Sequence, residues 1–495
     1  MNQTITISDN FWEYSARANF YLFPPTDTYV KELKDVSPIF LRAIPFMMVL
    51  TVVEWAILTL AGKARNWSLH DAIVNFSSGS LTLAVNSFFL RGIEFSGYLW
   101  VYSNLRITTL PWDSIYTYLM AVVGVDFCSY FWHRAFHECK GVVVFQSVEM
   151  CFRVDIMRLC FSVVSEYKEV ALGWSFHYLH HSSEYFNMSL GVRFSFFMRI
   201  IKWVFYLPLA ALGLPPPAFL IHNQLGYAWG MWYHNDACPK FSKIIPGIGH
   251  LIEYILVTPS HHRVHHGVNP YCIDKNFGQM FIVWDRMFGT FAEEREDEHI
   301  TYGTMSQVNS NHIFDNQVRP TIEVLQRAAS MPTFGDKLKA LFYGPGWAPG
   351  TPRLGIPEDI PDMRGRKRFE IHLPHWFSAY IFVNCSVLFY TYVQMAFRLK
   401  AVTLWEQRVN LAIHLLTCTS VGGLYDGREY SVWLEPLRLL FYLVSVLAIP
   451  IFSTLQETAV VVGVCLVSLL TWPRVSAITL SRATEASATA PNKVN

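Results

Sequence analysis

Histidines at short, repeated spacings are the residues in this sequence most able to do chemistry. Between residues 133 and 266, little more than a quarter of the chain, lie 12 of its 18 histidines. Eight of them form three motifs, His133-Arg-Ala-Phe-His137, His177-Tyr-Leu-His180-His181 and His262-Arg-Val-His265-His266. Residues three or four apart lie on one face of a helix, so each motif can direct two or three imidazoles toward one point. This spacing predicts metal binding.

The residue types narrow the kind of metal site. Neutral imidazole is the most common nitrogen ligand of metals in proteins, and burying this many histidines without an ion would leave ring nitrogens unpaired. The motifs contain no cysteine. A structural zinc–thiolate site is therefore not expected, whereas imidazole suits iron, zinc, copper or nickel. Eight ligands exceed the needs of one ion, so we predict two metals.

The composition indicates a membrane protein. The 495 residues are 52% hydrophobic and 16% aromatic, and only 16% are charged. The net charge of +1 gives no reason to expect nucleic acid as a partner. Nine scattered cysteines do not suggest a disulfide framework. The start of the chain does not have the basic and then apolar pattern of a cleaved signal peptide, so we expect the first membrane segment to direct insertion.

Several apolar stretches are long enough to cross a bilayer, which takes about 20 residues of helix. Glu54 lies in the first of them and is expected to be an inward-facing structural residue. The stretch 81–102 contains Arg91 and Glu94, and we interpret it as either a span or an interfacial helix. The other expected spans are 39–61, 114–132, 376–397, 408–424, 435–453 and 457–472.

The order of these stretches predicts where the metal site lies. The stretches 194–214 and 216–233 are separated by prolines and are expected to form a helical hairpin that returns the chain to the side it left. All three motifs then lie at one membrane face. Basic residues concentrate between the third motif and the next span, which favours the cytosol for that face.

The fold class we expect is all-α, a polytopic integral membrane protein with a histidine-rich di-metal site at its cytosolic face. Composition divides the chain into five expected parts. They are an N-terminal region with the first spans (1–113), a catalytic core with the motifs (114–300), a cytosolic cap containing Pro and Gly (301–375), C-terminal spans (376–475) and a polar tail (476–495).

A histidine-ligated metal pair at the end of membrane helices is suited to activating dioxygen for attack on an aliphatic carbon. Asp126 and Glu138 are candidates for hydrogen bonding to the imidazoles, although Glu138 could equally be an exposed charge at a helix end. His222 and His234 share a helix face if their helix is continuous, and we add both to the expected ligands. Three other histidines are not expected to bind metal: His250, His261 and His414.

The surroundings of the motifs resemble the fatty acid hydroxylase superfamily of membrane di-iron oxygenases, and within it most closely the alkylglycerol monooxygenases. The strings that carry the resemblance are His133–Glu138, His177-x-x-His180-His181-Ser-Ser-Glu184, Thr258–Gly267, Asn269–Asn276, Trp284-Asp285 with Phe288-Gly-Thr290, and the loop Gly344–Gly355. The histidine motifs are typical of the superfamily, whereas the longer strings are specific to the narrower group.

This resemblance implies a tetrahydrobiopterin-dependent di-iron enzyme. It would use O2 to hydroxylate the carbon next to the ether oxygen of an alkylglycerol or a lyso-alkyl phospholipid, and the hemiacetal would break down to a fatty aldehyde and a glycerol. We expect it in the endoplasmic reticulum membrane, with Glu138 as a catalytic residue. The ten implied ligands are His133, His137, His177, His180, His181, His222, His234, His262, His265 and His266.

Two rival functions remain open at this stage. One is hydroxylation or desaturation of a sterol or sphingolipid by another branch of the superfamily. The other is metal binding or transport in a membrane, which the gathering of histidines at one face disfavours. One stretch also departs from the family pattern, because residues 141–170, between the first and second motifs, have no recognised counterpart. They are either a surface insertion or an error in the gene model.

Overall fold

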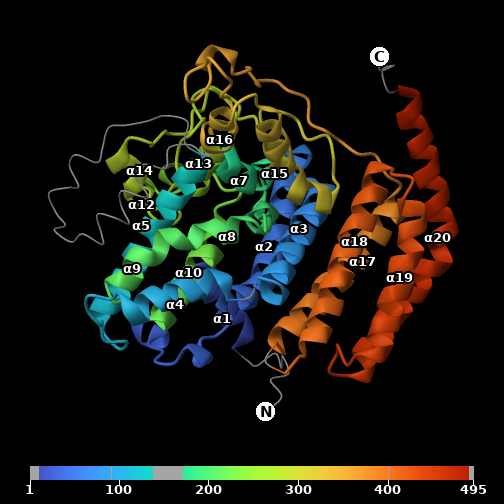
Figure 1. Ribbon diagram of the computed structural model, residues 1–495, viewed down its shortest axis with the longest axis horizontal. Helices are drawn as coiled ribbons and strands as arrows, with labels where there is room; N and C mark the ends of the chain where they lie inside the picture. Colours follow the sequence, from blue (N-terminus) through green and yellow to red (C-terminus); the bar gives the residue numbers. More distant parts are fainter. Residues whose placement is uncertain (1–9, 91, 138–170, 400, 490–495) are drawn as a thin grey trace.

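The computed structural model describes residues 10–90, 92–137, 171–399 and 401–489, and in this part of the chain helices are joined by irregular connections (Figure 1). It contains no β-strand, and β pairing in it is limited to isolated bridges. The expected all-α class is therefore confirmed. Helices that precede the second motif are α1 (Phe11–Asn19), α2 (Ile39–Leu60), α3 (Leu69–Phe88), α4 (Ile93–Asn104) and α5 (Ile115–His137), with 3-10 turns at Pro25–Thr28, Leu33–Asp35 and Ala64–Asn66.

The middle of the chain consists of shorter helices. They are α7 (Ala171–His181), α8 (Met198–Lys202), α9 (Leu207–Ala211), α10 (Pro216–Trp232), α11 (Phe241–Ile244), α12 (Ile248–Ile255), α13 (Pro259–His266), α14 (Val283–Phe288), α15 (Ile313–Ser330) and α16 (Phe334–Phe342). Three 3-10 turns complete this part: Met188–Val192, Trp203–Tyr206 and Pro357–Asp359.

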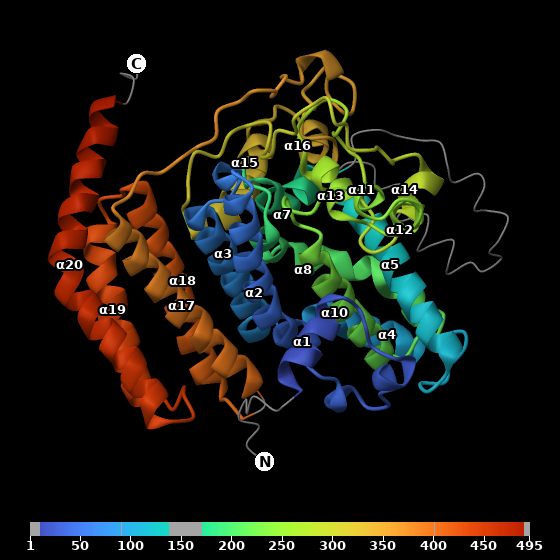
Figure 2. The ribbon, with the colours of Figure 1, turned by 180° about the vertical axis from the view of Figure 1, so that it is seen from behind.

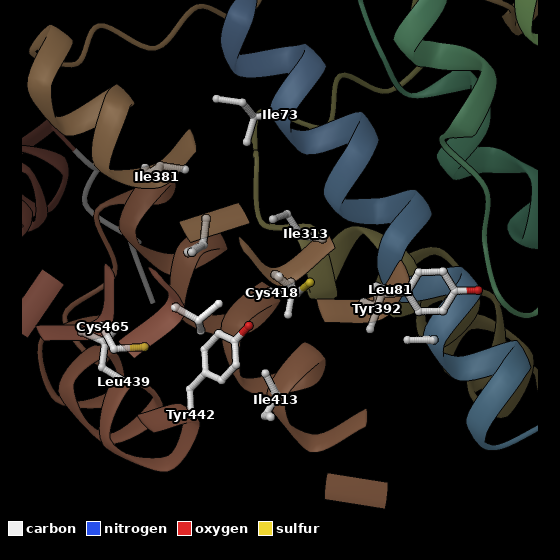
Figure 3. Close-up of a cluster of buried hydrophobic side chains, with 14 of the residues drawn as sticks. Ile73, Leu81, Ile313, Ile381, Tyr392, Ile413, Cys418, Leu439, Tyr442 and Cys465 are labelled. Atoms are coloured by element: carbon white, nitrogen blue, oxygen red, sulfur yellow. The ribbon is translucent and has the colours of Figure 1, made fainter. Parts of the chain in front are cut away.

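Four long helices follow and lie together at one side of the molecule (Figure 1). They are α17 (His375–Phe397), α18 (Leu404–Asp426), α19 (Ser431–Ala448) and α20 (Leu455–Thr489). Figure 2 shows the same bundle from behind, with α3 between it and the histidine-bearing helices. Figure 3 shows part of the apolar cluster that joins them, in which Leu81 of α3 packs near Ile413 and Cys418 of α18. Burial of these side chains attaches the bundle to α3.

Five helical segments are long and apolar enough to cross a membrane, so the chain is a multi-pass membrane protein. They are Leu33–Leu60, Ile115–His137, His375–Phe397, Ser431–Ala448 and Leu455–Glu485. All five overlap stretches that were expected to span the membrane, at 39–61, 114–132, 376–397, 435–453 and 457–472. Helix α18, over the expected span 408–424, does not meet the same criterion of apolarity.

Two expected elements differ from the structure. The stretch 81–102 is not one helix, because the chain turns between α3 and α4 at Gly92, whose φ of 88° is rarely adopted by other residues. The first arm of the expected hairpin, 194–214, is a series of short helices rather than a continuous span. The second arm is a single helix, α10, that ends just before His234.

Candidate metal centre

Nine histidines from four places in the chain form two adjoining groups. Within each group, one ligand atom per residue lies within 4.8 Å of every other. One group is His133, His137, His177, His181 and His265, and the second is His180, His234, His262 and His266. The C-terminal ends of α5 and α10 and the helices α7 and α13 supply them. The rings of His181 and His266 are stacked 4.3 Å apart, so the two groups share a boundary.

Hydrogen bonds fix which ring nitrogen of His180 and of His234 faces the centre of the second group. Nδ1 of His180 lies 3.2 Å from the carbonyl oxygen of Arg193, and Nδ1 of His234 lies 2.7 Å from that of Gly230. A carbonyl oxygen only accepts, so both Nδ1 atoms carry the proton and both Nε2 atoms of the neutral rings are bare. These two Nε2 atoms are 3.3 Å apart. Two facing lone pairs repel unless a cation lies between them, which is what a metal ion would supply.

The first group shows the same pattern. Nδ1 of His133 lies 2.8 Å from the carbonyl oxygen of Phe277, and Nδ1 of His265 lies 2.9 Å from that of Lys275. Their Nε2 atoms are therefore bare as well. The Nε2 atoms of His265 and His137 are buried without a hydrogen-bond partner. Unpaired buried nitrogens that converge are the arrangement expected of metal ligands.

Burial keeps these imidazoles neutral and so available to a cation. Desolvation lowers the pKa of His234 to about 3. It also lowers the pKa values of His180 and His266 well below the usual range, and neighbouring histidines add to the effect. Among the residues that the structure describes, the two groups consist of nine neutral nitrogen donors and contain no carboxylate or thiolate. Such a set fits two borderline metal ions such as Fe(II) or Zn(II). The residues present therefore fit a pair of iron ions.

Comparisons with known proteins agree with this geometry. The sequence model of one family, described as fatty acid hydroxylase, matches residues 118–290, which include all nine histidines. Alkylglycerol monooxygenase of Xenopus tropicalis is 33% identical over 428 residues, which cover 86% of each chain. The human enzyme of the same name is 33% identical over 89% of this chain and 88% of its own.

This chain belongs to the alkylglycerol monooxygenase family. A similar match is found to the enzyme of Danio rerio, 33% identical over 88% of this chain and 87% of the relative. A bacterial protein named ornithine lipid hydroxylase OlsE, from Rhizobium tropici, is 31% identical over only 24% of this chain. No solved structure matches the chain. The similarity to the alkylglycerol monooxygenase family thus extends well beyond the histidine core into both flanking regions.

His222 is the one histidine of the expected ten that lies outside both groups. Its Nδ1 is 2.5 Å from the hydroxyl of Tyr21, and its ring contacts Tyr118 edge-on. Because α10 is continuous from Pro216 to Trp232, twelve residues separate His222 from His234 by about 18 Å along the axis. A shared face does not mean a shared site at that distance, so the expectation that His222 is a ligand is not met by the geometry.

The three histidines not expected to bind metal also lie outside the two groups. His261 precedes the third motif, and its Nδ1 accepts a hydrogen bond from the backbone N–H of Thr258 at 3.3 Å. It therefore caps the start of α13. His414 is buried in the C-terminal bundle, where its Nδ1 lies 2.8 Å from the carbonyl oxygen of Asn410.

Asp126 has a different position from the expected one. Its carboxylate accepts hydrogen bonds from the backbone N–H of Met280 at 2.7 Å and from Nε1 of Trp284 at 2.8 Å, rather than from an imidazole. It joins α5 to the chain that follows α13. Glu138, the expected catalytic residue, and the stretch 141–170 lie outside the described residues. The histidines on either side of that stretch, in α5 and α7, nevertheless meet in the first group.

Asp285 supports the imidazoles indirectly, a role that the sequence did not reveal. It is fully buried, and its carboxylate accepts the backbone N–H groups of Phe277 and Gly278, each at 2.7 Å. The carbonyl oxygen of Phe277 in turn fixes His133. Asp274 is a further acid near the site, with Oδ1 4.0 Å from Nδ1 of His137. Such indirect contacts set the orientation and basicity of ligating rings.

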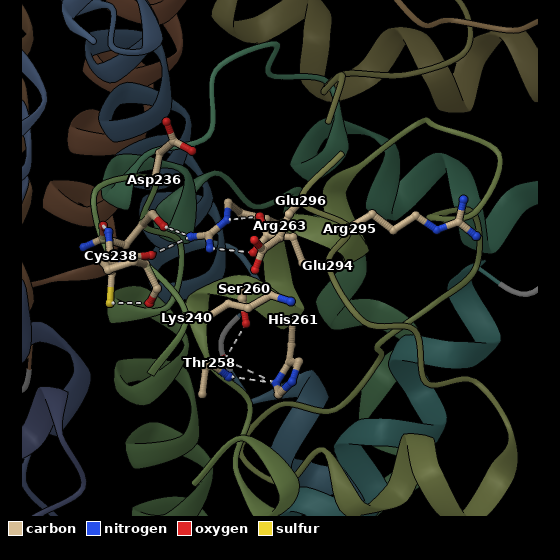
Figure 4. Close-up of polar contacts among 12 residues, drawn as sticks. Asp236, Cys238, Lys240, Thr258, Ser260, His261, Arg263, Glu294, Arg295 and Glu296 are labelled. Atoms are coloured by element: carbon tan, nitrogen blue, oxygen red, sulfur yellow. Dashed lines mark hydrogen bonds and ion pairs between the residues drawn. The ribbon is translucent and has the colours of Figure 1, made fainter. Parts of the chain in front are cut away.

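The third motif is held in place from outside the centre by an ion pair. Both Nε and Nη2 of Arg263 donate to the carboxylate of Glu294, at 2.7 and 2.8 Å (Figure 4). Its Nη1 donates to the carbonyl oxygens of Asn235 and Cys238. Arg263 therefore links α13 to the segment that directly follows His234. His234 belongs to the same histidine group as His262 and His266 of α13.

Glu54 performs a similar task from within the first span. The residue is 1% exposed, as expected of an inward-facing side chain. Its two carboxylate oxygens accept the backbone N–H groups of Met188, at 2.7 Å, and Asp236, at 2.9 Å. Met188 follows the second motif, and Asp236 lies two residues beyond His234. One carboxylate therefore holds together two segments that adjoin histidines of the two groups.

Proposed function

We propose that this protein is a glyceryl-ether monooxygenase whose nine clustered histidines hold two iron ions. The observation that carries the proposal is the convergence of these neutral imidazoles at one end of membrane helices, in a chain that belongs to the alkylglycerol monooxygenase family. The name of the relatives supplies the substrate class, an alkylglycerol. Lyso-alkyl phospholipids share the same ether linkage and are a second expected substrate.

The proposed reaction inserts one oxygen atom of O2 into the C–H bond next to the ether oxygen and reduces the other to water. Two electrons are required, and tetrahydrobiopterin is the proposed donor. The hydroxylated carbon then carries both an ether oxygen and a hydroxyl. In this hemiacetal the bond between the hydroxylated carbon and the ether oxygen breaks, which gives a fatty aldehyde and a glycerol. The iron pair would supply oxygen activation.

Residues of this chain would orient the histidine rings and exclude water from the site. Hydrogen bonds from Nδ1 to backbone carbonyls hold the rings of His133, His180 and His234 in one orientation. Because eight of the nine histidines are buried, all except His137, water is largely kept away from a reactive centre. Glu138, next to His137 in the sequence, is proposed as a catalytic residue, in line with its position in the family motif.

The proposed location is the endoplasmic reticulum membrane with the centre facing the cytosol. Basic residues after the third motif support that orientation by the positive-inside rule. A cytosolic face would also give the site access to a soluble pterin. Protease protection of tags placed after Lys339 and after Thr489, in sealed membrane vesicles, measures the orientation directly.

The test of function is release of fatty aldehyde from 1-O-hexadecylglycerol by membranes that contain the chain, with and without tetrahydrobiopterin. We expect aldehyde only with the pterin, and none from the His265→Ala variant. Aldehyde formation that is indifferent to the pterin would exclude it as the electron donor. No aldehyde from well-expressed wild-type protein would contradict the ether-lipid assignment and make sterols and sphingolipids the next substrates to examine.

A further inference from the structure

A cavity of about 1090 Å³ lies beside the metal centre, between the first membrane helix, α3, α8, α10 and the end of α17. Pockets for small molecules usually measure about 300–1,000 Å³, so this one is large enough for a ligand with a long chain. Much of its wall is apolar and includes Leu83 and Leu90 of α3. Such a wall suits the hydrocarbon part of a lipid.

The inner end of the cavity reaches the second histidine group. Phe194 lines the cavity, and its ring is stacked on that of His180 with centroids 5.5 Å apart. Tyr227, another lining residue, contacts the Phe194 ring edge-on at 6.1 Å. Phe194 therefore contacts both the cavity and the ring of His180, a proposed metal ligand.

The wall also carries the amide side chains of Asn86 and Asn223, and that of Asn86 lacks a hydrogen-bond partner inside the protein. Asn86 of α3 is 8% exposed, and neither Nδ2 nor Oδ1 of its side chain has a hydrogen-bond partner. It lies one helical turn beyond Thr82, whose hydroxyl donates to the carbonyl oxygen of Phe194. Asn223 of α10, also 8% exposed, lines the same cavity one turn from Tyr227. A buried unpaired amide costs free energy, so the side chain of Asn86 calls for a ligand or water.

We propose that this cavity binds the ether-lipid substrate, with the glycerol hydroxyls hydrogen bonded to Asn86 and Asn223 and the alkyl chain along the apolar wall. The inference rests on the proposed function and names the residues that select its substrate. Glycerol hydroxyls both donate and accept, as the two amides require. Phe194 sets how closely the ether carbon approaches the centre.

The experiment measures equilibrium binding to the metal-loaded, full-length protein under anaerobic conditions, where no turnover can occur. The ligands are 1-O-hexadecylglycerol and hexadecyl propyl ether, which has the same ether linkage but no hydroxyl. We expect the wild type to prefer the glyceryl ether by about 10-fold or more, since a site built for hydroxyls rejects a ligand without them. Asn86→Leu should lose that preference while binding the propyl ether as before.

Two further variants keep the test decisive. Asn223→Leu, on the other wall, should reduce the preference in the same way, so that misfolding of one variant does not decide the outcome. Asn104→Leu is the matched control, because Asn104 lies exposed at the end of α4 and donates to the carbonyl oxygen of Trp100. It should retain the preference. An unchanged preference in both Asn86→Leu and Asn223→Leu, with intact metal content, would overturn the inference.

Failure of the proposed function gives a different result. If wild-type protein releases aldehyde but the two variants keep the wild-type preference, the function stands and the assigned cavity is wrong. If anaerobic binding shows the preference and its loss but no aldehyde forms with oxygen and pterin, the cavity assignment stands and the reaction is wrong. Phe194→Ala adds a separate measure, because removing the ring should change the rate of aldehyde release more than the binding constant.

Discussion

His222 and His234 lie on one helix but have different surroundings, and this difference can be tested at the scale of single residues. His234 has a bare Nε2 facing those of His180 and His262, at 3.3 and 2.8 Å. We therefore expect His234→Ala to lose about one metal equivalent per chain and most activity, by at least about 100-fold. His222→Ala should retain both metals, because its partner is the hydroxyl of Tyr21. Elemental analysis of the purified variants checks both expectations.

The same pair of variants provides its own control, since both remove an imidazole from the same part of the chain. His222→Ala is expected to lower only stability, by about 1–3 kcal/mol, because a buried tyrosine hydroxyl loses its partner. A loss of metal in His222→Ala equal to that in His234→Ala would contradict the two histidine groups as the structure has them.

Most of the site could be predicted from residue spacing. The i, i+4 pair of each motif shares one group, because that separation fixes a helix face over a single turn. The i, i+3 pairs do not: His180 lies in the other group from His177, and His265 lies in the other group from His262. The same argument fails for His222, because two residues on one helix face can still lie far apart along the helix axis, as His222 and His234 do. The role expected of Asp126 was wrong for a related reason: its tertiary partner, the segment that follows the third motif, is far away in sequence.

At the scale of elements, Glu54 is the contact by which the first membrane helix acts on the metal centre. Its carboxylate binds the N–H groups of Met188 and Asp236 and touches no ligand directly. We expect Glu54→Ala to reduce metal affinity and activity by about 10–100-fold, as is usual when an indirect support of a ligand is removed. Titration with Fe(II) and measurement of aldehyde release check the two effects.

Glu54→Gln is the informative companion of this variant. Its amide oxygen can still accept one of the two N–H groups, so we expect recovery of part of the metal affinity. Thr59→Val, at the exposed end of the same helix, serves as the control and should resemble the wild type. Equal metal affinity in wild type and Glu54→Ala would show that the two segments are held without this carboxylate.

Deleting the stretch 141–170 would test whether α5 and α7 pack against each other without the chain between them. His137 of α5 and Trp174 of α7 have ring centroids 5.0 Å apart, and α7 also packs on α15. A link of three residues, 138–140, can extend over about 10 Å, which is sufficient for two such close helix ends. We therefore expect deletion of residues 141–170 to leave two metals bound and aldehyde release within about 3-fold of the wild type. Loss of both metals on deletion would contradict this view.

Helices were harder to predict than site residues wherever their bounds were inferred from apolar composition alone. The stretches 81–102 and 194–214 are apolar enough for single helices. The first is divided at Gly92, and the second consists of α8, a 3-10 turn and α9, which has Pro208 in its first turn. Hydropathy does not register these interruptions. Three of the four expected spans of the C-terminal bundle were easier to predict, because long apolar runs between polar turns leave few alternatives in a bilayer.

At the scale of the whole molecule, the burial of so many histidines makes the metal-free protein sensitive to acid. Burial lowers the pKa values of His234 and His261 to about 3 in the folded chain, against about 6.5 when it is unfolded. Between these values only the unfolded chain takes up protons at the two rings. Each ring can therefore reduce the free energy of unfolding by up to about 1.4 kcal/mol for every pH unit below about 6.5.

We accordingly expect the unfolding midpoint of chelator-treated protein to fall as the pH is lowered from 7 to 5, as measured by intrinsic fluorescence in detergent. His261→Asn separates the contribution of one ring, since an asparagine oxygen can still accept the N–H of Thr258 but does not titrate in this range. The free energy of unfolding of this variant should depend less steeply on pH. Metal-loaded protein should be more stable than the metal-free form at pH 7, because ions that bind only the folded chain favour it. If the midpoint of the metal-free wild type did not depend on pH, the imidazoles would be hydrated in the folded chain. Burial would then not be the reason that their nitrogens stay neutral and available to a metal.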